Sequence, residues 1–307
     1  MVRTGLLIFW AFFFSSVMPA SGAPGTTAAA YLKMFPSARP AALGGSFVGV
    51  ANDPGTVFYN PAGLRTLSHV EFMLSHMELV QGMHCESLVY VQPLQKGLVL
   101  GFSGELFTSG PIGKYNELGD RTGTFSAAEG MLGASIAGSI SGALLGGVTV
   151  KALHQGLDSE SALTGAVDAG LLYSSGRWRF GASAQNFGPA MKLGSTGFEL
   201  PRGVKAGALY RWPRLLSLSA QLTEYLREDP FLSVGAEIPL SREGNVMLRS
   251  GYRTGMSSGA GPGLSFGVGL RDTHLEFSYA LSPMGDLGMT HNISFSYKIG
   301  NAFTYDR

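Results

Sequence analysis

The 307-residue sequence is poor in charged residues, in cysteine and in long hydrophobic runs. Asp, Glu, Lys and Arg make up 14% of the chain, whereas soluble domains carry about 25% charged residues. The 22 basic and 21 acidic residues nearly balance, and no basic run stands out. This composition excludes the electrostatic pattern of a nucleic-acid-binding protein, so we expect no nucleic-acid partner.

Cys85 is the sole cysteine, which excludes an internal disulfide and, far from the N-terminus, a lipid anchor. Beyond the first 23 residues no segment approaches the roughly 18 continuous apolar residues of a transmembrane helix. An ordinary helical membrane protein is therefore excluded. A membrane β-barrel is compatible with all of these absences.

The first 23 residues predict a secretory signal peptide. Arg3 supplies the basic start, LLIFWAFFF from Leu6 to Phe14 the apolar centre, and ASGA from Ala20 to Ala23 the small-residue cleavage zone. We expect cleavage after Gly22 or Ala23. The alternative is an uncleaved membrane anchor, but the apolar run is shorter than the ~20 residues that a spanning helix needs. The chain is expected to be exported.

From residue 69 onward apolar and small or polar residues alternate. Near the C-terminus Ile293, Phe295 and Tyr297 alternate with Ser294 and Ser296, which places them on opposite faces of a strand. The strand lengths centre on the ~9–11 residues of a tilted membrane strand. About fourteen strands are predicted, near residues 69–80, 84–92, 97–109, 125–138, 143–155, 162–174, 177–187, 203–212, 215–225, 231–239, 245–255, 263–270, 273–281 and 289–299.

The connections between these segments alternate in length. They are short after even-numbered strands, as at residues 175–176 and 213–214, and longer after odd-numbered ones, as at 110–124 and 188–202. Outer-membrane barrels have short periplasmic turns and longer outer loops. We therefore predict an all-β fold, a transmembrane antiparallel β-barrel over residues 68–299, in the outer membrane of a Gram-negative-type cell.

An even strand number returns both ends of the barrel to the periplasmic side. The segment 24–67 is accordingly expected to be periplasmic or to form a plug. Residues 300–307 form a short tail, or else the last strand extends to Phe303 or Tyr305. The expected partners include the lipid of the outer membrane and the barrel assembly machinery.

A soluble, exported β-sandwich or barrel is the competing fold. Its water-facing surface would carry both charge signs densely, whereas the less apolar face here is mostly Gly and Ser, with about one charge per strand. Closure also removes unpaired strand edges, which a bilayer does not tolerate. Both arguments favour the membrane barrel.

Charged residues at inward-facing positions predict a salt-bridged lumen that holds a plug rather than a dedicated substrate site. They are Arg179, Lys205, Arg211, Glu237, Arg249, Arg253, Arg271, Glu276 and Lys298. The six histidines lack companions at metal-ligand spacing, and no GxSxG, P-loop or HExxH motif occurs. We expect no enzymatic activity, and no catalytic residues, metal site or cofactor.

The segment before the first strand does not alternate. From Met34 to Leu64 it reads MFPSARPAALGGSFVGVANDPGTVFYNPAGL, and it resembles the opening motif of the PorV/PorQ family. The residues that carry this match include Arg39, Gly44, Gly45, Asp53, Pro54, Asn60, Pro61 and Gly63. The segments 110–127 and 284–299 resemble further parts of the same family.

The resemblance implies a fourteen-stranded FadL-like barrel in which residues from about 31 to 67 fold inward as a plug. The glycines of the motif allow tight backbone paths, and its Asn, Asp and Pro residues form turns, so we interpret the motif as structural, with gating as the alternative. A barrel of this size is too wide for its own side chains to fill. Transport or secretion across the outer membrane is implied.

Three functions remain open at this stage. The chain is a passive channel for hydrophobic small molecules, a type IX secretion component that handles exported proteins, or a purely structural barrel. The residues themselves do not name a substrate.

Overall fold

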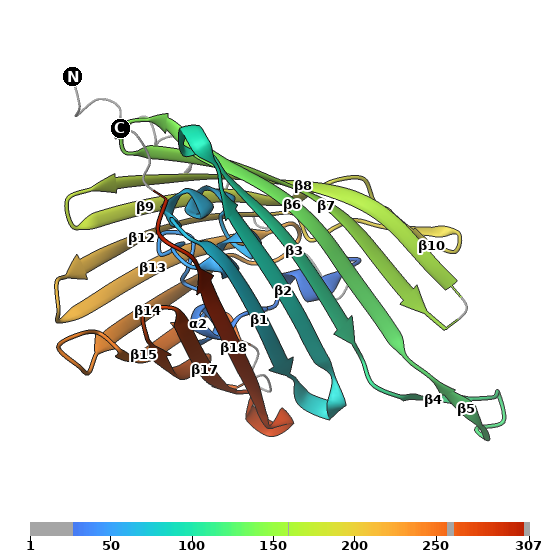
Figure 1. Cartoon of the computed structure of the whole chain (residues 1–307). Coiled ribbons are helices and arrows are strands. Elements are labelled where there is room, and N and C mark those ends of the chain that lie inside the picture. Colours follow the sequence, from blue (N-terminus) through green and yellow to red (C-terminus); the bar gives the residue numbers. More distant parts are fainter. Residues whose placement is uncertain (1–26, 159, 257–260, 304–307) are drawn as a thin grey trace.

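The computed structural model describes residues 27–158, 160–256 and 261–303, so the predicted signal peptide and Tyr305 lie outside the described residues. Within these ranges fourteen long antiparallel strands close into a barrel (Figure 1). None of the helices in the described ranges has the length and apolar character that crossing a membrane requires. The predicted fold, an antiparallel barrel of fourteen strands, is confirmed.

Neighbouring strands of the barrel pair in sequence order, and the last pairs with the first, from Val70 opposite Ile299 to Glu78 opposite His291. The strands are β1 (Val70–Glu78), β2 (His84–Pro93), β3 (Val99–Thr108), β6 (Ala127–Ser141), β7 (Leu144–Leu157), β8 (Glu160–Ser175), β9 (Trp178–Phe187), β12 (Gly203–Trp212), β13 (Leu216–Tyr225), β14 (Phe231–Pro239), β15 (Val246–Arg253), β16 (Leu264–Arg271), β17 (Leu275–Pro283) and β18 (Met289–Ile299). Beyond β18, residues 300–303 form a tail in which the Phe303 amide donates to the Ser68 carbonyl at 2.6 Å.

Two of the long connections contain hairpins that the alternation pattern does not predict. They are β4 (Ile112–Tyr115) with β5 (Arg121–Phe125), and β10 (Met191–Leu193) with β11 (Thr196–Phe198). Figure 1 shows the β4–β5 hairpin projecting well beyond the rim of the barrel. Three short 3₁₀ turns, η4 (Val80–Gly82), η5 (Gln95–Gly97) and η6 (Gly285–Leu287), lie in other connections.

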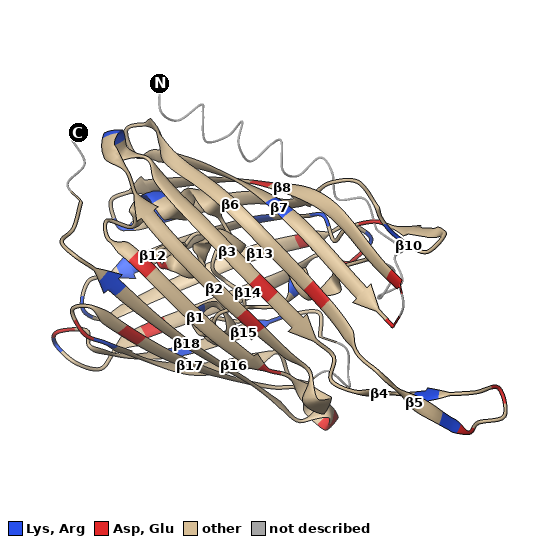
Figure 2. Ribbon diagram, turned by 45° about the vertical axis from the view of Figure 1, so that its right-hand side comes forward, with Lys and Arg blue, Asp and Glu red and all other residues tan. Residues whose placement is uncertain are grey.

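The two faces of each strand differ as the alternation predicts. Phe266, Ile293 and Phe295 are exposed on the outer wall, whereas Ser265 and Ser294 are buried on the inner one. Charged positions on the strands are few and isolated (Figure 2). An apolar wall of this extent is suited to lipid rather than to water.

The segment before β1 folds inside the barrel and forms a large part of its core. It contains η1 (Ala30–Lys33), α2 (Ala38–Ala42), η2 (Pro54–Phe58) and η3 (Pro61–Thr66). Fully buried side chains of the plug pack against the inner wall; they include Tyr31, Leu43, Phe47, Tyr59 and Leu64.

The plug segment runs through the lumen from one end of the barrel to the other. Its last turn, η3, leads into β1 at the turn side. At the loop side, the Ala28 amide donates to the Glu199 carbonyl at 3.0 Å, and Lys33 forms an ion pair with Glu228. Residues 28–33 therefore lie near the loop-side connections of the barrel. Strand parity determines where the chain enters β1, but not where a preceding segment ends.

Candidate functional site in the barrel lumen

Arg39, a buried residue of α2, joins the plug to the wall of the barrel. Its Nε and Nη2 donate to the two carboxylate oxygens of Glu237 on β14, at 2.7 and 2.8 Å. Its Nη1 donates to Asn52 at 2.9 Å and to Asp53 at 3.2 Å within the plug. Burial by itself lowers the pKa of Arg39, but Glu237 and Asp53 outweigh this and raise the pKa above its ordinary value. Arg39 is therefore a permanent cation in this network.

The network continues across four strands of the wall. Arg249 on β15 donates to Glu237 at 3.1 Å, to Ser278 on β17 at 2.8 Å and to Glu276 at 3.3 Å. Glu276 also accepts two hydrogen bonds from Arg271 on β16. The structure thus places four of the predicted lumen charges in one connected set.

Two other predicted lumen cations contact the plug separately. Arg179 on β9 donates to the Val50 carbonyl at 2.9 Å. The buried Lys205 on β12 has its Nζ 5.4 Å from the ring centre of Tyr59 and 5.7 Å from that of Tyr225. Arg211 occupies an inward position of the same strand and is partly buried, whereas Arg253 lies apart from these groups, in the cavity described below.

The Asn and Pro residues of the plug motif have structural roles. The Nδ2 of Asn60 donates to the Val48 carbonyl at 2.9 Å and to the Leu171 carbonyl of β8 at 3.0 Å, while its Oδ1 accepts from the Ala62 amide. Pro54 and Pro61 begin η2 and η3. The motif therefore both shapes the plug and attaches it to the wall.

Asp53 directly precedes η2 and accepts a hydrogen bond from Arg39. Burial raises the pKa of this carboxyl above its ordinary value, and Arg39 offsets the rise only in part. Glu237 holds the better contacts of Arg39, since both of its oxygens accept from the guanidinium. Asp53 is thus the weaker of the two carboxylate partners.

Glycines of the inner wall let the plug backbone lie directly against the strands. A Cβ added to Gly170 would lie 2.0 Å from Asn60 Oδ1, and one added to Gly251 would lie 2.1 Å from the Gly44 amide nitrogen. The wall glycines that meet plug backbone or side chains in this way are Gly101, Gly147, Gly170, Gly181, Gly207, Gly235, Gly251 and Gly267. Sequence reasoning missed this role, because each of them reads simply as a small residue on the less apolar face.

Three glycines of the plug are equally constrained. Gly44 and Gly45 have φ of +62° and +85°, in the left-handed region that favours glycine. A Cβ on Gly63 would lie 2.2 Å from Thr56 Oγ1. Their positions in the motif follow from backbone shape and close approach.

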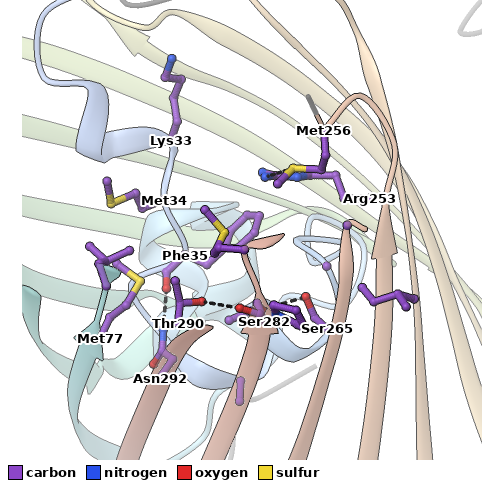
Figure 3. A pocket seen from close by; sticks show the side chains of 18 of the residues that line it. Lys33, Met34, Phe35, Met77, Arg253, Met256, Ser265, Ser282, Thr290 and Asn292 are labelled. Atoms are coloured by element: carbon purple, nitrogen blue, oxygen red, sulfur yellow. Dashed lines mark hydrogen bonds between the residues drawn. The ribbon is translucent and has the colours of Figure 1, made fainter. Parts of the chain in front are cut away.

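A cavity of about 370 Å³ lies between the plug and the loop-side ends of the neighbouring strands. Figure 3 shows apolar side chains from the plug and from the wall around it, among them Met34, Phe35, Met77 and Met256. Arg253 also reaches this cavity. Sequence alternation alone does not bring these residues together.

One side of the cavity is polar. The hydroxyls of Ser265 and Ser282 lie 2.9 Å apart, and Thr290 donates to the Ser282 carbonyl. Asn292 donates to the Phe35 carbonyl at 2.7 Å. The cavity therefore combines an apolar lining with one polar side. In the described ranges no cluster of His, Cys, Asp and Glu is suited to a metal ion.

No protein-family model matches the chain, and no curated protein matches it. Solved structures do. The CymD monoaromatic hydrocarbon channel has a TM-score of 0.62 at 13% identity, over 86% of this chain and 98% of that one. The Ralstonia pickettii toluene transporter TbuX has a TM-score of 0.60 at 13% identity, over the same shares of the two chains.

A Pseudomonas aeruginosa FadL homologue is similar as well, with a TM-score of 0.57 at 12% identity, over 87% of this chain and 99% of that one. At such identities the likeness concerns the fold. The chain has the fold of FadL-like outer-membrane β-barrels.

Proposed function

We propose that this chain is an exported outer-membrane channel that admits hydrophobic small molecules from the loop side of the barrel. The observation that carries the proposal is the cavity between the plug and the loop-side ends of the strands. The lining of this cavity is largely apolar and includes Met34, Phe35 and Phe231. A site of this kind binds a small apolar solute with little loss of free energy from buried polar groups, since it offers apolar contacts and only a few polar groups.

The solutes of two similar proteins support the same class of solute. CymD is described as a monoaromatic hydrocarbon channel and TbuX as a toluene transporter. In both cases the shared feature with this chain is the barrel fold. The apolar cavity is the independent argument, because it comes from the side chains of this protein.

Reconstitution into liposomes tests the proposal. Vesicles that contain the barrel should take up radiolabelled toluene into an enclosed protein acceptor faster than vesicles without it. A matched variant, Met77→Glu, places a carboxylate in the apolar lining and should slow uptake without changing the gel mobility of the folded barrel. Equal uptake by loaded and empty vesicles contradicts the channel.

A second candidate is a type IX secretion component of PorV/PorQ type that handles exported proteins. The motif resemblance over residues 34–64 and 284–299 supports it, and so does the projecting β4–β5 hairpin (Figure 1). Leu118 at its tip is 87% exposed and Tyr115 is 63% exposed, which suits contact with another protein. Co-purification of an exported protein that is lost on Leu118→Ser supports this candidate, and a barrel that purifies alone from cells secreting such proteins contradicts it.

A further inference from the structure

Arg253 is a cation without a carboxylate partner in the apolar cavity. Its Nη2 donates to the sulfur of Met256 at 2.7 Å. Its Cζ lies 5.5 Å from the ring centre of Phe35 and 5.4 Å from that of Phe231. Among the described residues no Asp or Glu lies within ion-pair distance of this guanidinium.

The other charged residues around the cavity neutralise each other. Lys33 and Glu228 both line it, and they form an ion pair. Glu228 also attracts Arg253 electrostatically, but no ion pair joins the two. The described charged residues that line the cavity, Lys33, Glu228 and Arg253, therefore carry a net charge of +1. Holding an unpaired charge among apolar side chains costs free energy, and an anionic group bound there would recover it.

The side chains around Arg253 also determine from which direction an anion can approach its guanidinium. Phe35 and Phe231 interact with the guanidinium through their rings, and Met256 accepts from Nη2 alone. Among the described residues, no side-chain acceptor other than Met256 bonds to the planar guanidinium, which has five N–H donors. A carboxylate is the group that matches this edge, since it accepts two parallel hydrogen bonds in the same plane.

The rest of the cavity indicates the body of the ligand. Three aromatic residues, Phe35, Tyr225 and Phe231, and four methionines line it. Thioether sulfur and aromatic edges both make favourable contacts with aromatic rings. The volume of about 370 Å³ is near the lower end of small-molecule sites, roughly 300–1,000 Å³. This favours one compact ring over a long flexible chain.

We propose that this cavity is a binding site for a compact aromatic monocarboxylate, with the carboxylate on Arg253 and the ring among Phe35, Phe231 and the methionines. The proposal deepens the proposed channel function, on which it rests, by naming the class of solute that the site selects. It differs from a site for a neutral hydrocarbon in requiring a charge on the ligand.

Titration calorimetry of the intact, detergent-solubilised barrel tests the site directly with benzoate as the probe. Arg253→Met keeps the length of the side chain and removes its charge, and it should weaken benzoate binding by about tenfold or more. Arg253→Lys should recover part of the affinity, because it restores the charge without the planar edge. Arg227→Met is the matched control, since Arg227 lies at the same end of the barrel and pairs with Glu199 outside the cavity.

Two further probes distinguish the ligand classes. Toluene has the ring without the carboxylate, so its affinity should be the same for the wild type and Arg253→Met. Hexadecanoate has the carboxylate without the ring, and it should compete with benzoate only weakly. Benzoate affinity that does not change in Arg253→Met overturns the proposal, and so does hexadecanoate that binds more tightly than benzoate.

Uptake into liposomes separates this site from the channel function. Benzoate that binds in an Arg253-dependent way, in a barrel that moves no solute, supports the site and contradicts the channel. Toluene uptake by a barrel that does not bind benzoate supports the channel and contradicts the benzoate site. The folded state of each variant is established by its gel mobility before and after boiling, so a loss of binding is not mistaken for a loss of fold.

Discussion

Arg39 of the plug and Glu237 of β14 are 198 residues apart in the sequence and share two hydrogen bonds, of 2.7 and 2.8 Å, inside the barrel. Both side chains are buried. The pair therefore joins a segment that enters the lumen to the wall that surrounds it. A buried, two-point contact of this kind depends strongly on the presence of both partners.

Arg39→Met should destabilise the folded barrel. It leaves Asp53 without this cation and Glu237 with Arg249 alone, and removing one partner of a buried ion pair costs about 3–5 kcal/mol. The temperature at which the fast-migrating folded band converts to the unfolded band on a denaturing gel should fall. Ionic conductance in planar bilayers should rise, because the plug is held less firmly.

Lys114→Met is the control for this variant. Lys114 pairs with Asp158 outside the lumen, and the side chains are 51% and 45% exposed, so the loss should be about 0–1 kcal/mol. An Arg39→Met barrel that melts and conducts like the Lys114→Met barrel contradicts the anchoring role of Arg39.

Gly251→Ala should displace the plug from the wall. The new Cβ would lie 2.1 Å from the Gly44 nitrogen and 2.2 Å from the Leu43 carbonyl carbon, and backbone atoms do not give way as a flexible side chain does. Overpacking of this kind costs about 1–3 kcal/mol. Gly130→Ala is the matched control, since its nearest neighbour would lie at 3.6 Å. The gel melting temperature should fall for Gly251→Ala and not for Gly130→Ala. Equal melting temperatures for the two variants would mean that the plug moves away from the new Cβ without loss of stability.

The carboxyl of Asp53 gives the barrel a defined dependence on pH. Its pKa is raised in the folded protein by burial, so the folded state favours the protonated form. This contribution to stability is fully present below about pH 4, the ordinary range for Asp, and is lost as the pH rises through the raised pKa. Asp53→Asn should flatten that part of the profile.

Melting temperatures across a pH series test this prediction. Asp120→Asn, an exposed carboxyl in the connection between β4 and β5, should keep the wild-type profile. If Asp53→Asn and the wild type lose stability in parallel as the pH rises, the Asp53 carboxyl is not the cause of this pH dependence.

Val268→Arg should show that the outer wall meets lipid. Val268 lies on the outer face of β16 and is 37% exposed. An Arg near the bilayer midplane costs about 2–4 kcal/mol. Leu118→Arg, at a position 87% exposed on the β4–β5 hairpin, should change nothing. Refolding into lipid vesicles under urea measures the difference, and equal midpoints for the two variants would argue against lipid at β16.

Much of the barrel was predictable because its pattern is local. The alternation around Phe295 and Ser294 reports which face each residue occupies, whatever the strand pairs with. The same holds for the number of strands and for the turn-forming Pro54 and Pro61. The β4–β5 and β10–β11 hairpins were not predicted, since these short strands lie within long, irregular connections.

By itself the sequence determined the closed barrel and its apolar outer face, because both follow from the period of a strand. The plug was implied by the family resemblance, and the backbone preferences of Gly, Pro and Asn agree with it. Only the tertiary structure decided that Arg39 pairs with Glu237 and that residues 28–33 lie at the loop side. It also decided that Arg253 lies among Phe35, Phe231 and Met256, with no ion pair in the described part of the chain. The reason is physical. These contacts join the plug to distant strands, and the depth at which an inward residue meets the plug depends on the stagger of the closed barrel.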